Sequence, residues 1–288
     1  FKKANLRGIN IDAVIHFAGL KSVKESISNP ISYWDNNVKG SINLFKAMAN
    51  NNCNIIVFSS SATVYGKQPI SPIDENSSLN PINPYGETKV AVEKILENIF
   101  KGYRKKWGII NLRYFNPIGS HETGLIGENP LNYPNNIFPL ICKVALKEIK
   151  KFSIYGNDWP TKDGTCVRDY IHVMDLAEAH LSSLNYLFKN DNEFHNLNIG
   201  TGKGTSVLEL INIFEESNKC NINYEFTDRR AGDTAVVVAD NKLALSILDW
   251  KPKRNIKSMC KDGWKSVQIL KDYELNNNFA NEKIQILN

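Results

Sequence analysis

The chain has 288 residues, of which 42% are hydrophobic and 23% charged, a composition typical of globular proteins with a substantial buried core. Its formal net charge of +5 is carried in short basic runs only, so we do not expect nucleic acid to be a main partner. No apolar run reaches the roughly 20 residues that span a bilayer, and the first residues lack a signal-peptide core, so we expect no membrane association.

The cysteines and histidines of the chain show no metal-binding pattern. Its five cysteines, an odd number, are scattered without a C-x-x-C pair, which fits neither a disulfide framework nor a zinc site. None of the five histidines is spaced for a metal or a serine triad, and His16, inside an apolar run, is more typical of a satisfied core residue than of a ligand. We therefore expect a cytoplasmic protein without a metal site.

Apolar runs and helical segments alternate in the first part of the chain. The β-branched run "IDAVIHFAG" (11–19) predicts a buried parallel strand, a helical segment covers about 30–50, and "NIIVFSSS" (54–61) predicts the next strand. A Pro- and Ser-rich loop (69–84) leads to a helix that begins near Tyr85, and "GIINLRYFN" (108–116) predicts a third strand. This alternation predicts an open parallel sheet, with ligands bound beyond the carboxyl ends of its strands.

The second part of the chain is less regular. One helix, "NNIFPLICKVALKE", is predicted among Gly, Pro and Asn clusters, and "VRDYIHVMDLAEAHLSSL" (167–184) predicts another strand and helix of the main sheet. Further strands are predicted at "FHNLNIG" (194–200) and "INYEF", with a helix from Ser206 capped by Thr205 between them. We expect residues 1–116, with contributions from about 166–188, to form the main domain, and residues 117–288 to form mainly a smaller substrate-binding domain.

The segment "NPYGETKVAVEK" places Tyr85 and Lys89 on one helix face. With 11 tyrosines, a Tyr-x-x-x-Lys arises by chance about once in such a chain, so the pair alone can be an ordinary exposed helix face. Ser61, however, ends the preceding predicted strand at the same sheet edge. A hydroxyl, a phenol and an ammonium that converge there form a proton-handling set, in which lysine lowers the phenol pKa and serine holds the substrate oxygen.

A series of motifs extends this pattern along the chain: "VIHFAGLKSVKES", "DNNVKG", "FSSSATVYG", "NPYGETK", "LRYFNPIG", "PNNIFP", "GTCVRDYIHVMDLA", "NIGTGKGTSV" and "RRAGD". In this order they resemble the UDP-glucose 4-epimerase family of extended short-chain dehydrogenases/reductases, over about residues 11–265. The motif YxxxK is shared by the whole superfamily, whereas "SSSATVYG" together with "GTCVRDYIHV" and "RRAGD" is much narrower. The resemblance implies an α/β fold with a Rossmann-like, doubly wound parallel sheet that binds NAD, and a smaller α/β domain that binds a UDP-sugar.

The resemblance also implies an activity and a set of site residues. Tightly bound NAD takes hydride from C4 of the hexose and returns it to the other face, which interconverts UDP-glucose and UDP-galactose in a homodimeric enzyme. Tyr85 is the implied acid/base at the 4-hydroxyl, Ser61 hydrogen-bonds the same oxygen, and Lys89 binds the nicotinamide ribose and depresses the Tyr85 pKa. The implied cofactor-binding residues are Phe17, Ala18, Gly19, Lys21, Asn36, Ser59, Tyr85, Lys89 and Tyr114. The implied substrate-binding residues are Ser61, Asn116, Asn136, Ile137, Tyr155, Arg168, Arg230, Asp233 and Val237.

The chain departs from the family pattern at its start. The family's G-x-x-G-x-x-G loop precedes the counterpart of "IDAVIHFAG", and no such motif occurs here, so we expect a fragment of a longer polypeptide that is inactive alone. Alternatives are a nucleotide-sugar 4,6-dehydratase or decarboxylase, or a non-catalytic homologue that binds nucleotide sugars. Dehydratases carry a carboxylate pair after the serine, whereas Ser-Ala-Thr-Val-Tyr contains no acid. At Val237 a small side chain leaves room for UDP-N-acetylhexosamines as a second substrate pair.

Overall fold

The computed structural model describes residues 1–102, 106–130, 134, 136–230 and 232–286. The strands are β1 (Ala13–His16), β2 (Ile55–Ser61), β3 (Gly108–Tyr114), β4 (Asn116–Ile118), β5 (Phe152–Tyr155), β6 (Val167–His172), β7 (Phe194–Ile199), β8 (Gly204–Ser206), β9 (Tyr224–Thr227) and β10 (Val236–Val237). The helices are α1 (Lys2–Asn5), α2 (Val23–Ser28), α3 (Pro30–Tyr33), η1 (Trp34–Lys39), α4 (Gly40–Asn50), η2 (Ala62–Tyr65), α5 (Pro84–Gly102), α6 (Ile137–Ala145), α7 (Val173–Lys189), α8 (Val207–Asn218), α9 (Lys242–Leu248) and α10 (Ile256–Ile286).

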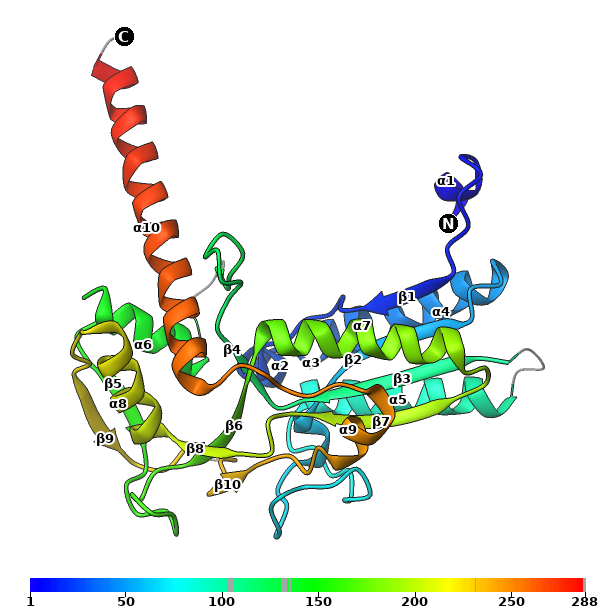
Figure 1. Cartoon of the computed structure of the whole chain (residues 1–288), viewed down its shortest axis with the longest axis horizontal. Coiled ribbons are helices and arrows are strands. Elements are labelled where there is room, and N and C mark those ends of the chain that lie inside the picture. Colours follow the sequence, from blue (N-terminus) through cyan, green and yellow to red (C-terminus); the bar gives the residue numbers. More distant parts are fainter. Residues whose placement is uncertain (103–105, 131–133, 135, 231, 287–288) are drawn as a thin grey trace.

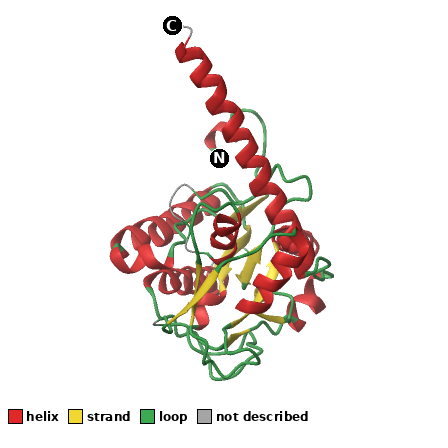
Figure 2. Cartoon of the chain, turned by 90° about the vertical axis from the view of Figure 1, so that its left-hand side faces the viewer, coloured by secondary structure: helices red, strands yellow, loops and turns green. Residues whose placement is uncertain are grey.

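The main sheet is parallel throughout and has the order β1-β2-β3-β7. Side chains of β2 alternate between two cores: Val57 packs with residues of α7 and α9, whereas Ile56 and Phe58 pack with residues of α4 and α5. Period-2 alternation with apolar residues on both faces is what a buried parallel strand requires. Helices therefore cover both faces of the sheet (Figures 1 and 2), which confirms the predicted Rossmann-like, doubly wound fold.

A second group of short strands lies beside the main sheet. Strand β6 pairs in parallel with β4 and β10 and antiparallel with β8, and β5 pairs with β9. The core of this half is formed by α6, α8 and the start of α10, with Phe138, Ile141, Phe214 and Met259 buried together. In Figure 1 the remainder of α10 extends away from the body of the protein.

Two strand assignments made from the sequence are wrong. Strand β6 was expected in the main sheet but belongs to the second group, and β7, expected in the second half, forms the edge of the main sheet beside β3. Helix α7, which follows β6, does pack on the main sheet as predicted. The reason is visible in β6, where Tyr170 enters the core of the second half and Ile171 the core beneath α7. A short apolar strand carries no local signal for its partner.

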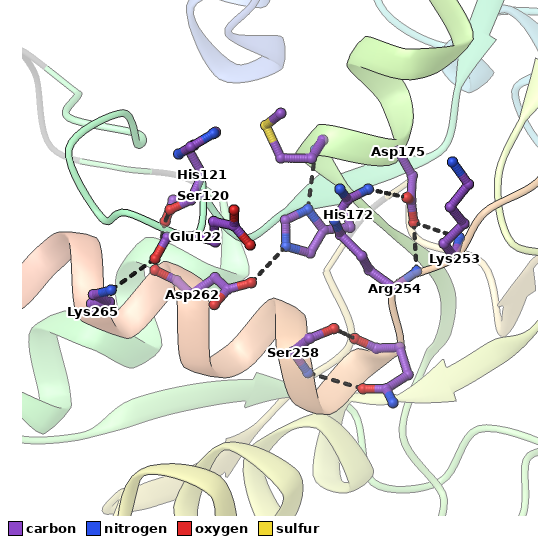
Figure 3. A network of polar contacts seen from close by, with 12 residues as sticks. Ser120, His121, Glu122, His172, Asp175, Lys253, Arg254, Ser258, Asp262 and Lys265 are labelled. Atoms are coloured by element: carbon purple, nitrogen blue, oxygen red, sulfur yellow. Dashed lines mark hydrogen bonds and ion pairs between the residues drawn. The ribbon is translucent and has the colours of Figure 1, made fainter.

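A polar network fixes the start of α10 to the end of β6 (Figure 3). The buried carboxylate of Asp175 accepts hydrogen bonds from the backbone N–H groups of Lys253 and Arg254, at 3.1 and 2.9 Å, and from the Arg254 guanidinium at 2.5 Å. Beside it, His172 Nε2 lies 3.2 Å from Asp262 Oδ2 on α10. Burial lowers the His172 pKa, so the ring is neutral near pH 7.

Two local predictions are refined by the structure. Helix α8 is capped by Ser206 rather than Thr205, because the Ser206 side chain accepts from Glu209 N and the Glu209 side chain returns the bond in a capping box. The glycine-rich "GTGKG" segment (200–204) leads from β7 into β8 ahead of this helix, and its Thr201 and Gly202 N–H groups bind the Asp169 carboxylate at 2.8 and 2.9 Å. These donors are therefore used within the fold.

Among the described residues, no helix combines the length and apolarity needed to cross a bilayer, and no cluster of His, Cys, Asp or Glu side chains is arranged for a metal ion. The predicted core role of His16 is confirmed, since its ring is buried and lies 2.9 Å from Ser41 Oγ.

Candidate active site

The candidate site lies where β2 and β3 end and α5 begins. Helix α5 starts at Pro84, and the side chain of Asn83 accepts from the Gly86 N–H at 2.9 Å, which satisfies an amide of the first turn. A Cβ at Gly86 would lie 2.9 Å from both the Thr63 carbonyl oxygen and Pro81 Cβ. Glycine therefore lets the first turn of α5 approach the end of β2, and this contact brings Tyr85 to Ser61.

Tyr85 and Ser61 meet as the sequence predicts. The Ser61 side chain lies near the Tyr85 hydroxyl group, and the Tyr85 ring stands edge-on to the buried ring of Tyr33, with 6.5 Å between centroids. Burial raises the Tyr85 pKa above its ordinary value, and the Ser61 side chain partly opposes this shift. The phenol is therefore protonated at neutral pH in the chain alone.

Lys89 lies one helical turn after Tyr85 and is 5% exposed. Its Nζ donates to the Ser59 carbonyl oxygen at 2.6 Å and stands 4.8 Å from the centroid of the Phe58 ring. Burial lowers the Lys89 pKa to about 8, and the charge of Glu93 opposes this shift. In the chain alone desolvation of the phenol dominates the Tyr85 pKa, and the depression of this pKa by Lys89 stays a prediction.

The remaining predicted cofactor residues form an open surface around this centre. Phe17 is 58% exposed, and Ala18, Gly19, Lys21 and Asn36 are exposed as well. Lys21 Nζ pairs with Glu128 at 3.1 Å. Tyr114 is half-buried at the end of β3, where its hydroxyl group lies 2.5 Å from His180 Nε2 and near the Ser59 side chain.

Sequence reasoning missed Asn37, the buried neighbour of Asn36. Asn37 Oδ1 accepts from Leu20 N at 2.7 Å, and its Nδ2 donates to Leu20 O and to Thr88 Oγ1 at 3.0 and 3.2 Å. Because Asn37 lies in η1, a π-helical segment, its side chain is directed between the end of β1 and α5. The doubled asparagine of "DNNVKG" was the available signal.

Five predicted substrate residues gather on the second half of the protein. Asp233 Oδ1 lies 2.9 Å from Arg230 Nη2 and 3.7 Å from Arg168 Nη2, so one carboxylate faces two guanidinium groups. The Arg230 guanidinium also stands 5.3 Å from the centroid of the Tyr155 ring, and Val237 is paired with Arg168 across β10 and β6.

The other three predicted substrate residues come from different elements. Asn116 begins β4, beside Tyr170 of β6. Asn136 and Ile137 begin α6, where Asn136 Nδ2 donates to Glu128 at 3.4 Å. Glu128 thus lies between Lys21, a predicted cofactor residue, and Asn136, a predicted substrate residue.

The unused donors and acceptors of this site fit a nicotinamide dinucleotide and its sugar substrate. The Lys89 ammonium has three N–H donors, and among the described residues only the Ser59 carbonyl accepts from it, which leaves donors for ribose hydroxyl groups. Thr63 Oγ1, next to Ser61, is buried and has no hydrogen-bond partner within the described part of the chain. Thr63 is a further residue that sequence reasoning missed, although it stands inside the quoted motif "SSSATVYG".

Comparisons with known proteins agree with this geometry. The family model described as GDP-mannose 4,6 dehydratase matches residues 3–263. A bifunctional UDP-glucose 4-epimerase and UDP-xylose 4-epimerase from Arabidopsis thaliana is 49% identical over 254 residues, which cover 88% of this chain and 72% of the relative. The UDP-glucose 4-epimerase of Bacillus subtilis is 47% identical over 255 residues, which cover 88% of this chain and 75% of the relative.

Solved structures show the same relationship. The UDP-glucose 4-epimerase of Stenotrophomonas maltophila, with bound NAD and formylated UDP-arabinopyranose, matches with a TM-score of 0.91 at 44% identity, covering 94% of this chain and 80% of that one. The enzyme of Bifidobacterium longum, in complex with NAD+ and UDP, matches with a TM-score of 0.85 at 42% identity, covering 92% of this chain and 78% of that one. With identity near one half and a common fold, this chain belongs to the UDP-glucose 4-epimerase family.

Proposed function

We propose that this chain catalyses the reversible 4-epimerisation of UDP-glucose and UDP-galactose with NAD as its cofactor. The observation that carries the proposal is the convergence of Ser61, Tyr85 and Lys89 at one edge of a parallel sheet, in a chain whose relatives are UDP-glucose 4-epimerases. Bound NAD supplies the hydride acceptor and donor for C4 of the hexose.

The residues of the chain handle the proton of the same alcohol. Tyr85, in its phenolate form, takes the proton from the 4-hydroxyl group and later returns it, while Ser61 holds the oxygen by a hydrogen bond. Lys89, anchored by the Ser59 carbonyl, directs its remaining donors to the nicotinamide ribose, and its positive charge favours the phenolate when Tyr85 gives up its proton. Phe17, Ala18, Gly19, Lys21, Asn36 and Tyr114 line the cofactor side in this proposal.

The second half of the protein supplies the UDP-binding groups. Arg168 and Arg230 both face Asp233 in the structure, and a bound diphosphate offers these guanidinium groups stronger bidentate partners. Asp233 is then free to accept from the ribose hydroxyl groups. Asn116, Asn136, Ile137 and Tyr155 complete the proposed pocket.

We also propose UDP-N-acetylglucosamine and UDP-N-acetylgalactosamine as a second substrate pair. Val237 is half-buried beside Arg168, within the group of substrate residues, and its small side chain leaves space next to the sugar. A 4,6-dehydratase reaction is disfavoured, because Ala62 and Thr63 follow Ser61 where dehydratase chemistry needs acids.

We propose a homodimer in the cytoplasm. Val23, Ile27, Ile31 and Trp34 are 39%, 65%, 80% and 41% exposed on the neighbouring segments α2, α3 and η1, which supports a contact between two copies. The five cysteines are all free, which supports a reducing compartment. Light scattering of the native protein tests the dimer, and a monomer at micromolar concentration contradicts it.

The reaction itself is tested by incubating the native protein with UDP-galactose and NAD in D₂O and following the sugar by NMR. We expect UDP-glucose without deuterium at C4 or C5, since hydride leaves and returns within the site. Deuterium at C5 with a 4-keto-6-deoxy product indicates a dehydratase. Bound UDP-sugar without any turnover indicates a non-catalytic homologue.

A further inference from the structure

His180 contacts two residues of the proposed cofactor surface, although it lies on a different element from both. It is 2% exposed on α7, on the face that packs against the main sheet. Its Nε2 lies 2.5 Å from the Tyr114 hydroxyl group at the end of β3, and its ring centroid lies 4.7 Å from that of Phe17, which follows β1. The mechanism described above gives this histidine no role.

The other ring nitrogen fixes the direction of these bonds. His180 Nδ1 lies 2.8 Å from the Leu176 carbonyl oxygen, which can only accept, so Nδ1 carries a proton. Burial lowers the His180 pKa, so the ring holds no second proton near neutral pH. Nε2 is therefore an acceptor, and the Tyr114 hydroxyl group must donate to it.

This direction determines how Tyr114 meets Ser59. Because its own proton is donated to His180, the Tyr114 oxygen can meet the nearby Ser59 hydroxyl group only as an acceptor. Ser59 also supplies the carbonyl that anchors Lys89. The imidazole of His180 on α7 thus orients Tyr114 on β3, which lies near Ser59 on β2. The same imidazole packs against the exposed ring of Phe17.

We propose that His180 is a positioning residue: as the neutral Nδ1–H tautomer it orients the Tyr114 phenol and the Phe17 ring for the nicotinamide end of the cofactor. The inference rests on the proposed function only for the identity of that cofactor. The tautomer of His180 is a property of the chain itself and is independent of the proposed function.

A second Tyr–His pair, between α7 and β7, provides a matched control. Tyr186 Oη lies 3.4 Å from His195 Nε2, with the rings edge-on at 5.6 Å, which resembles the Tyr114–His180 arrangement at 5.5 Å. His195 is instead half-buried near the amino-terminal end of β7 and pairs with Glu193 at 2.9 Å, and within the described part of the chain it has no hydrogen bond or ring contact with a proposed site residue.

The tautomer is tested by NMR of the native protein labelled with ¹⁵N-histidine. We expect one histidine to show a protonated Nδ1 and an unprotonated Nε2 near pH 7, and its signal to disappear in His180→Gln. A proton on Nε2, or a charged ring at that pH, overturns the inference and leaves the epimerase assignment untouched.

Variants then test the positioning role. We expect His180→Phe, which keeps a ring beneath Phe17 but no acceptor, to weaken NAD binding and lower kcat about tenfold each, with the UDP-sugar KM unchanged. His180→Gln, which restores an acceptor, should recover both to within about threefold, and His195→Phe should change neither. Equal losses in His180→Gln and His180→Phe, or an equal loss in His195→Phe, contradict the proposal. Absence of epimerase activity in the native protein instead contradicts the proposed function.

Discussion

Lys89 and His16 lie buried near each other beneath the candidate site, and each holds a positive charge less readily than in water. Burial lowers the pKa of Lys89 to about 8, and burial together with the charge of Lys89 lowers the pKa of His16 to about 4. At neutral pH the pair is therefore an ammonium beside a neutral imidazole, which is the state that the proposed reaction uses.

The Lys89 pKa predicts an alkaline limit for activity. The ammonium loses its proton as pH rises through about 8, so kcat/KM, which reports the free enzyme, should fall above that pH. Lys89→Arg stays charged throughout and should show a lower but flatter profile. A wild-type kcat/KM that stays level to about pH 9, roughly one unit above the Lys89 pKa, would show that the reaction does not need the Lys89 ammonium.

The His16 pKa predicts a loss of stability in acid. Above its unfolded-state pKa of 6.5 the ring is neutral in both states, whereas between 6.5 and about 4 the unfolded chain binds a proton that the native protein does not. The contribution of neutral His16 to the free energy of unfolding is therefore complete above pH 6.5. It is lost as pH falls towards 4, and the total loss is about 3 kcal/mol. Urea unfolding of wild type and His16→Gln should show the smaller acid sensitivity in the variant, and parallel curves would refute the assignment.

Val237 tests the proposed breadth of substrate. Val237→Tyr adds bulk to a half-buried position beside Arg168, and overpacking costs about 1–3 kcal/mol. We expect the variant to lose activity on UDP-N-acetylhexosamines by about 10- to 100-fold while activity on UDP-glucose and UDP-galactose changes little. The measurement is kcat/KM for both substrate pairs, and equal losses, or no N-acetyl activity in the parent, count against a pocket role.

At the scale of elements, one carboxylate joins the start of α7 to the segment that leads into α10. Asp175 is fully buried and accepts from two backbone N–H groups and Arg254, so Asp175→Asn should destabilise the protein by roughly 2–3 kcal/mol through lost and unsatisfied hydrogen bonds. Glu178→Gln, which removes only exposed pairs with Lys253 and Arg254, should cost about 0–1 kcal/mol. Urea unfolding compares the two variants, and losses of the same size would show that burial of Asp175 does not matter.

Elements defined by local pattern could be predicted from the sequence, and their partners could not. Strands β1, β2 and β3 and the start of α5 follow from apolar runs and from the turn before Tyr85, so the Ser61–Tyr85–Lys89 set was predictable. Strands β6 and β7 were assigned to the wrong sheets, because strand pairing depends on residues far apart in the chain. Asn37 and His180 were not predicted as site residues for a related reason: their polar partners come from other elements.

At the scale of the whole molecule, the site lies between two groups of strands. The end of β2 supplies Ser61 and the start of α5 supplies Tyr85 and Lys89, while the second group supplies Arg168, with Asp233 close by. The proposed function thereby assigns proton transfer and UDP binding to separate parts of the chain. A variant in one part should leave the function of the other intact.

Tyr85→Phe uses this separation to test the central claim most directly. The variant removes one hydroxyl group from α5 and no residue of the UDP-binding group, so UDP-sugar affinity measured by calorimetry should stay within about twofold of the native protein. Turnover of UDP-galactose should fall by the roughly 10²- to 10⁴-fold that a general acid/base contributes. A loss below about tenfold, with the affinity unchanged, would contradict the assignment of Tyr85 as the group that moves the proton at the 4-hydroxyl.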